Sequence, residues 1–170
     1  MVATGDGTPE RLDGARVLPG FFELLRVEPL LGRVFRTVDG ETGSARVAVL
    51  THGLWQRRYY GDPAVLGRII TLDDRRVEVI GVLPASFRSL RFADLSPTGN
   101  RAGRPEVFEP LAWTDLQLRS PGAFDYPALL RLPPDVTPQQ ATVELDGILA
   151  DAYAGVPIQP SAYVARWRTR

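Results

Sequence analysis

The chain is built from short apolar runs whose spacing separates the expected strands from the expected helices. Residues 68–83 alternate between apolar and polar positions, which predicts a hairpin with its bend at Asp73 and Asp74. The run 46–51 has no polar face, so we expect a strand that is buried on both sides. Further strands are predicted at residues 15–18, 105–113 and 126–134.

The stretch 51–61 has the features of a short, well-capped helix. Thr51 can cap its first turn and Gly61 can end it. We expect one side of this helix to be buried, formed by Leu54, Trp55 and Tyr59. The other side, with Gln56, Arg57 and Tyr60, should face outward. A helical turn with an apolar face is expected at residues 21–25. Another turn is expected after Asp62, which can cap it, with Pro63 at its first position and Gly67 at its end.

A longer helix is predicted at 137–155. Thr137 and Gln140 form a capping box and Gly155 closes the last turn. The helix has an apolar stripe formed by Ala141, Leu145, Ile148, Leu149 and Ala152.

Strands and helices alternate without clean strand–helix–strand units, so the fold class predicted is α+β, with a mixed sheet and short helices. Residues 37–45 predict an exposed loop, and residues 85–104 predict a long surface loop. Loops of that length in a compact domain are usually functional or mobile.

Composition excludes several classes of function. Twenty arginines balance twenty acidic residues, whereas a duplex-binding domain usually has a positive excess, so we predict no nucleic-acid partner. Cysteine is absent, which removes disulfides and thiolate metal sites. No apolar run approaches the roughly 18 residues that span a bilayer, and the first residues lack the pattern of a secretory signal.

The single histidine, His52, directly follows the expected cap. No nucleophile motif accompanies it, so we expect a solvent-exposed histidine and not a catalytic base. One histidine without cysteine is too little for a zinc site. Asp39 and Glu41 alone are too few acidic residues for a calcium loop.

The sequence also offers no pair of carboxylates suited to glycoside hydrolysis. Asp73 and Asp74 are adjacent in a bend, and the spacing of Glu106 and Glu109 places them on opposite faces of a strand. Without lysine a phosphate-binding P-loop cannot form. We therefore predict no catalytic, cofactor-binding or metal-binding residues, no cofactor and no enzymatic activity, with a hydrolase as a distant third alternative.

Arg57 and Arg58 beside Trp55 and Tyr59 have the composition of a stacking platform for single-stranded nucleic acid. The same residue types also fit an amphipathic helix that buries its rings and leaves its guanidinium groups in water. Zero net charge favours the amphipathic helix.

Three blocks of the chain resemble the MacB-like periplasmic core domain of FtsX-like and MacB-like ABC transporter permeases, especially the duplicated permeases of acidobacterial type. These blocks are GARVLPGFFELLRVEPLLGRVF, VAVLTHGLWQRRYYGDPAVLGRIITLDDRRVEVIGVLPASF and LPPDVTPQQATVELDGIL. The resemblance runs from Gly14 to Leu149 and includes the order and spacing of the blocks. It gives packing roles to Gly20, Phe21, Phe22, Leu54, Trp55 and Gly81.

The resemblance implies a non-enzymatic domain on the extracytoplasmic face of the bacterial cytoplasmic membrane, between the first two transmembrane helices of a permease. Its implied role is to relay conformational change during export. Its implied partners are the permease helices, a separate ABC ATPase, and an extracytoplasmic adaptor or cargo. The alternative is a stand-alone extracytoplasmic binding module that uses the 85–104 loop.

The blocks also suggest how the chain is divided. We expect residues 1–13 to be an N-terminal remnant, 14–155 a partial core domain, and 156–170 a segment leading towards a missing transmembrane helix. As a fragment, the chain should expose apolar, unpaired strands at 46–50 and 68–72 and the apolar side of the C-terminal helix, and it should be marginally soluble. Asp73-Asp74 replaces the Asp-Gly usual at the family's hairpin bend, which predicts strain if the backbone φ is positive.

Overall fold

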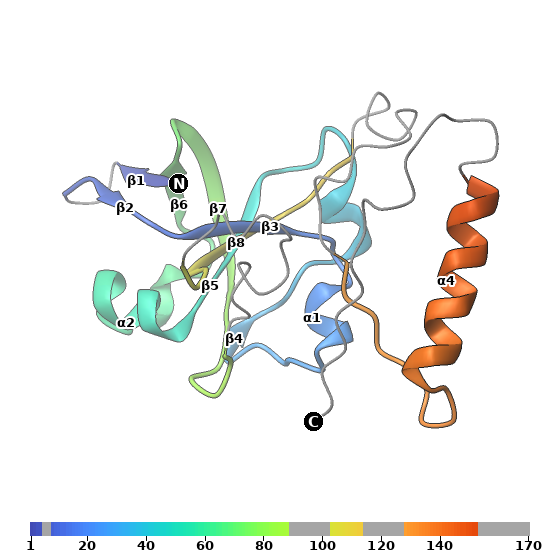
Figure 1. Cartoon of the computed structure of the whole chain (residues 1–170). Helices are drawn as coiled ribbons and strands as arrows, with labels where there is room; N and C mark the ends of the chain where they lie inside the picture. The colour runs from blue at the N-terminus through green and yellow to red at the C-terminus, as the bar shows by residue number, and fades with distance from the viewer. Residues whose placement is uncertain (5–7, 89–102, 114–127, 153–170) are drawn as a thin grey trace. The chain divides into compact units, whose positions relative to one another are not determined.

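The computed structural model describes residues 1–4, 8–88, 103–113 and 128–152 (Figure 1). Two compact units divide the chain. The first comprises Met1–Arg91 and Ala102–Trp113, and the second Phe92–Arg101 and Thr114–Arg170.

The described part of the first unit contains a sheet of eight strands with short helices and 3-10 turns between them. The elements in chain order are β1 (Val2–Thr4), β2 (Glu10–Arg11), β3 (Gly14–Val17), α1 (Phe21–Leu24), β4 (Leu31–Gly32), the 3-10 turn η1 (Thr37–Gly40), β5 (Val47–Leu50), α2 (His52–Tyr59), the 3-10 turn η2 (Pro63–Val65), β6 (Ile69–Leu72), β7 (Arg75–Val82) and β8 (Val107–Pro110).

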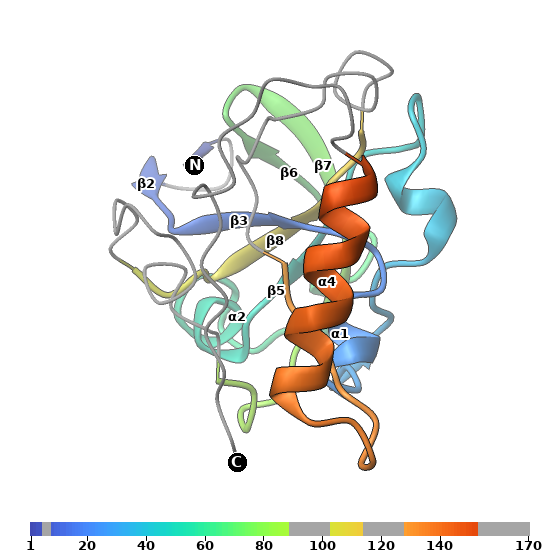
Figure 2. The same ribbon diagram turned by 45° about the vertical axis from the view of Figure 1, so that its right-hand side comes forward.

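The strands are ordered β2-β1-β6-β7-β5-β8-β3, with β4 pairing separately with β7. The pairs β3–β8 and β5–β7 are parallel, and the remaining pairs are antiparallel. Figure 2 shows β5, β8 and β3 side by side. The predicted α+β class with a mixed sheet and short helices is therefore confirmed.

Strand β5 is the centre of the core, and all four of its residues are buried, as its uninterrupted apolar run predicts. Its Ala48 and Leu50 belong to an apolar cluster with Leu54 and Trp55 of α2. A second group of rings gathers around Phe108 of β8, which contacts Phe21, Phe22 and Phe87.

The predicted hairpin is present as β6 and β7, paired from Ile69–Glu78 to Leu72–Arg75. Both bend residues have positive φ, 48° at Asp73 and 62° at Asp74, so the strain expected from a bend without glycine is present. Asp73 also fastens the neighbouring strand β1, because its amide donates to the Val2 carbonyl and its carboxylate accepts from the Val2 amide at 2.7 Å.

Several expectations are wrong. Strands 46–50 and 68–72 have no unpaired edge, because β5 lies between β7 and β8 and β6 lies between β1 and β7. The loop 37–45 is largely exposed, as predicted, but it contains the turn η1, whose Asp39 is buried. Residues 128–134 form no strand, while 126–127 and most of the loop 85–104 lie outside the described residues.

Strands β1, β2 and β4 were not predicted, since two or three residues are too few to show a period. The two N-terminal strands belong to the same sheet as the later ones.

The described part of the second unit contains α4 (Pro138–Ala152). The predicted capping box is present: the Gln140 amide donates to Thr137 Oγ1 at 3.3 Å, and the Thr137 amide donates to Gln140 Oε1 at 2.8 Å. The expected end of the helix, Gly155, lies outside the described residues.

Candidate functional site

Helix α2 is positioned by the local signals that the sequence carries. Thr51 has extended backbone angles and its hydroxyl accepts from the Leu54 amide at 3.3 Å, which confirms the predicted cap. Tyr60 closes the helix with φ 54°, one residue before the expected Gly61, where φ is 69°. The Asp62 carboxylate then accepts from the Ala64 amide at 2.9 Å and caps the turn η2, as predicted.

The inner face of α2 is core, as expected from its spacing. Trp55 is 7% exposed, and its Nε1 donates to the Asp62 carbonyl at 2.9 Å. Tyr59 is buried beside it, with the Arg68 guanidinium 5.6 Å from its ring centre. Because both rings are packed in this way, they cannot form an open stacking surface for bases.

His52 does not stand free in solvent, which corrects the sequence-based expectation. The ring is half-buried and lies edge-on to Trp55, with 5.5 Å between the ring centres. An i, i+3 separation places the two residues on neighbouring positions of one helix face, which accounts for the contact.

The outer face of α2 carries an ion cluster that local sequence spacing does not reveal. Arg57 donates to Glu106 at 2.6 Å and to Glu10 at 2.7 Å, and Arg58 donates to Glu10 at 3.0 Å. Arg58 also donates to the Thr8 carbonyl at 3.2 Å. We call Glu10, Arg57, Arg58 and Glu106 the α2 ion cluster.

The α2 ion cluster is electrostatically well matched. The hydrogen bond to Glu106, more than that to Glu10, raises the pKa of Arg57 above its ordinary value. The hydrogen bond from Arg57 lowers the pKa of the Glu10 carboxyl, with a smaller contribution from Arg58 that adds to it against the effect of burial. These arginines are thus engaged by carboxylates of the same chain, which leaves little positive charge for a phosphate backbone.

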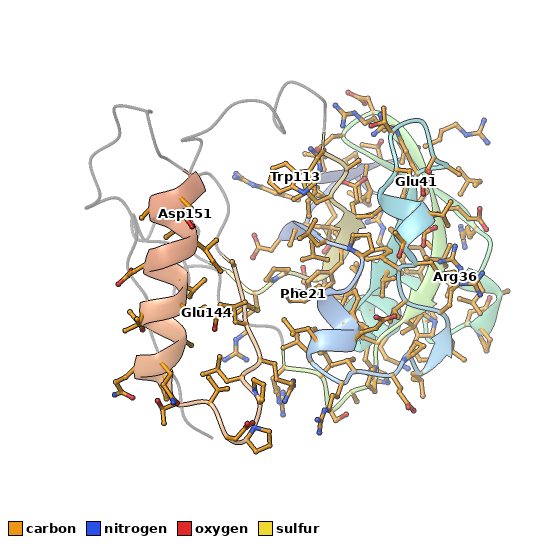
Figure 3. The ribbon with its side chains drawn as sticks, turned by 90° about the vertical axis from the view of Figure 1, so that its right-hand side faces the viewer. Phe21, Arg36, Glu41, Trp113, Glu144 and Asp151 are labelled. Atoms are coloured by element: carbon orange, nitrogen blue, oxygen red, sulfur yellow. The ribbon has the colours of Figure 1, made fainter. Side chains whose placement is uncertain are left out.

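A second ion pair explains why Asp39 is buried. Arg33 donates two hydrogen bonds to the Asp39 carboxylate, at 2.6 and 3.0 Å, and the Arg36 amide donates a third at 2.6 Å. Burial would raise the pKa of Asp39, but the bonds from Arg33 and Arg36 outweigh it and lower the pKa. Arg36 and Glu41, which flank η1, are exposed (Figure 3). Asp39 and Glu41 therefore do not share a calcium loop.

Glu106 and Glu109 do not form a pair of carboxylates facing one site. Glu109 is buried against Arg16 at 3.6 Å, whereas Glu106 binds Arg57, so the two glutamates have different partners, as their spacing predicts. Within the described ranges there is no group of three or more acidic or histidine side chains that could hold a metal ion. A shallow groove of about 440 Å³ lies between η1 and β7, with Arg33, Asp39, Leu66, Glu78 and Ile80 among its lining residues.

Comparison with models of protein families shows the family of this chain. Residues 2–148 match the family model of the MacB-like periplasmic core domain. The chain belongs to this family. MacB-like periplasmic core domains are parts of ABC-type transporter permeases and are not a known class of enzymes. The match begins at residue 2, so it includes β1 and β2 as well as the three blocks noted above.

One solved structure shares the fold. The periplasmic region of MacB from Actinobacillus actinomycetemcomitans is similar with a TM-score of 0.59 and 13% identity, over 90% of this chain and 63% of that one. The extracellular domain of the noncanonic ABC-type transporter YknZ from Gram-positive bacteria gives a TM-score of 0.47 and 20% identity, over 65% of this chain and 49% of that one. This MacB-like domain thus spans less than two thirds of either solved domain.

No curated protein matches the chain by sequence. Within the described residues, none of the helices has the length and apolar character needed to cross a bilayer.

Proposed function

We propose that this MacB-like domain acts on the extracytoplasmic face of the bacterial cytoplasmic membrane and relays conformational change in an export permease. The partners would be the permease's own transmembrane helices, a separate ABC ATPase, and an extracytoplasmic adaptor or cargo. The observation that carries the proposal is the family match over residues 2–148.

The fold of the first unit suits a part that transmits motion. Its mixed sheet is packed around the fully buried strand β5, and closely packed interiors move as one body and transmit strain. The strand β1 and the hairpin bend of β6 and β7 are fastened to each other through Asp73 and Val2. A displacement applied at one strand is therefore carried to its neighbours across the sheet.

The proposed location can be tested by thiol labelling in the bacterium that makes the protein. The chain has no cysteine, so Tyr60→Cys introduces one thiol into it, at a side chain that is 90% exposed. A membrane-impermeant maleimide should label this variant in intact spheroplasts. Val79→Cys, at a fully buried position, is the matched control and should label only after denaturation. Labelling of Tyr60→Cys only after lysis would place the domain in the cytoplasm.

The proposed relay needs a second measurement. An environment-sensitive maleimide on Tyr60→Cys, attached in cells and followed in inverted membrane vesicles, should change its emission when Mg-ATP is added. The same vesicles with ADP provide the control. If ATP hydrolysis proceeds and the emission stays constant, the domain does not relay nucleotide-driven motion.

A further inference from the structure

The α2 ion cluster joins three segments that are far apart in the chain. Glu10 belongs to β2, Arg57 and Arg58 to α2, and Glu106 precedes β8. Figure 1 shows β2 above α2, and the hydrogen bonds from Arg57 and Arg58 to Glu10 cross between these two elements. The N-terminal hairpin, formed by β1 and β2, therefore has an attachment to the molecule besides its strand pairing.

That strand pairing is short. Strand β2 pairs only with β1, through Val2–Arg11 and Ala3–Glu10, and β1 pairs with β6 through two residue pairs. The hairpin nevertheless covers the core, since Ala3 of β1 and Leu12, directly after β2, are each 2% exposed. Opening it would uncover these side chains and the edge of β6. Further backbone bonds support the pairing, since the Leu12 amide donates to the Met1 carbonyl and Val2 exchanges hydrogen bonds with Asp73. A short segment at the end of a sheet nevertheless opens more easily than the centre, so side-chain contacts add to its stability.

Glu106, by contrast, is held firmly by its backbone. Its carbonyl accepts from the Thr51 amide at 2.8 Å, and its amide donates to the Asp13 carbonyl at 2.7 Å. Glu106 thus stands at the junction of α2, β3 and β8. Arg57 bridges this fixed carboxylate and the Glu10 carboxylate of the hairpin.

The side chains of Arg57 and Arg58 differ in their exposure to dissolved ions. The side chain of Arg58 is 8% exposed, while those of Arg57, Glu10 and Glu106 are 48%, 34% and 30% exposed. Ions in solution screen exposed charge pairs and have much less effect on buried ones. The bridge through Arg57 is therefore the part of the cluster that responds to ionic strength.

We infer that the α2 ion cluster is a salt-sensitive latch that fastens the N-terminal hairpin to α2. When the latch is closed, the hairpin and α2 move together. When the bridge through Arg57 is screened or removed, the hairpin opens more often while the centre of the sheet stays closed. A local change in ionic strength at the domain surface would then regulate how tightly the hairpin is coupled to the helix.

Hydrogen–deuterium exchange on the full chain tests the latch. Arg57→Gln should accelerate exchange of the described hairpin amides by about five- to tenfold, which corresponds to the loss of two exposed ion pairs. Amides of β5 should keep their rates. The matched control is Arg11→Gln, which makes the same change at an exposed arginine of β2 outside the cluster and should leave the hairpin rates unchanged.

The dependence of hairpin exchange on salt concentration is a second measurement, and a purely structural role of Arg57 would not produce it. Raising NaCl to about 0.5 M should accelerate hairpin exchange in the unmodified chain, and Arg57→Gln should remove most of this dependence. The latch is refuted if salt leaves the hairpin rates unchanged, if Arg11→Gln has the same effect as Arg57→Gln, or if β5 exchanges faster in equal measure. Because these experiments use the chain alone, their outcome is separate from that of the labelling and vesicle experiments.

Discussion

At the scale of single residues, Trp55 shows how one side chain can serve two structural purposes. Its ring fills the space between α2 and the sheet, and its Nε1 satisfies the Asp62 carbonyl at the start of the next turn. Removing the ring therefore leaves a cavity and also an acceptor without its partner.

We expect Trp55→Ala to lower the free energy of unfolding by about 3–5 kcal/mol. Trp55→Phe should cost less, because it keeps most of the packing and loses the hydrogen bond to Asp62. Urea denaturation measures both variants. Tyr60→Ala is the control, since the Tyr60 side chain is 90% exposed, and a comparable loss there would contradict the assignment of Trp55 to the core.

Asp39 predicts a specific sensitivity to acid. Its pKa in the folded chain is below the ordinary value of 3.8, so it adds stability at pH values above 3.8 and loses that stability as the pH falls through the lowered pKa. Asp39→Asn should therefore lower the free energy of unfolding at neutral pH. As the solution is acidified, the difference in this free energy between the variant and the unmodified chain should become smaller. Thermal unfolding between neutral pH and about pH 3 measures this difference. A constant difference across the range would contradict the role given to the Arg33 pair.

How much of the site was visible in the sequence depends on the distance between partners. The caps at Thr51, Asp62 and Thr137 were predicted because each involves residues two or three positions apart. Glu10 and Arg57 are 47 positions apart, and no local spacing relates them. His52 was misplaced because an exposed first turn is the common outcome and its contact with Trp55 depends on packing.

At the scale of elements, Gly81 and Gly53 differ in the space available for a side chain. Strand β4 approaches β7 so closely that a Cβ atom at Gly81 would collide with the carbonyl of Arg33. At Gly53, in the first turn of α2, a Cβ atom would meet nothing within 4 Å.

The same substitution should consequently have opposite effects at these two sites. Gly81→Ala should separate β4 from β7 and destabilise the chain by about 2 kcal/mol or more. Gly53→Ala should stabilise it by up to about 0.5 kcal/mol, because alanine restricts the unfolded chain and favours the helix. Thermal melting of the two variants compares them directly. Destabilisation of both to a similar degree would refute the close approach of β4.

The elements that were predicted are those with a clear period or strong end signals. Strand β5, the β6–β7 hairpin, α2 and α4 all have such signals. Strands β1, β2 and β4 are defined by their partners in the sheet and not by their own sequence, as the pairing of β4 with the last residues of β7 illustrates. The order of the strands likewise follows from packing that no single segment encodes.

At the scale of the whole molecule, the N-terminal strands test where the domain begins. If residues 1–13 were a remnant, removing them would leave the fold intact. In the structure, β1 lies along the edge of β6. We expect a chain that starts at Gly14 to expose that edge and to associate through it.

Size-exclusion chromatography and binding of an apolar dye compare the shortened and full chains. The shortened chain should elute as larger species and bind more dye. The unmodified chain, measured at the same concentration, is the control. A monomeric, dye-negative and cooperatively folding shortened chain would show that residues 1–13 are a dispensable remnant, as the predicted division of the chain has it.

The pairing of β3 with β8 has a consequence for the order in which the molecule forms. Gly14 and Val107 are neighbours in the sheet although more than 90 residues separate them in the chain. Contacts between such distant segments require closure of a long loop and slow the folding reaction. During synthesis, β3 must therefore wait for β8 to leave the ribosome, while the β6–β7 hairpin can already form. We expect this late step to limit the folding rate, so a chaperone that shields β3 would raise the yield of native protein more than one that acts on the hairpin.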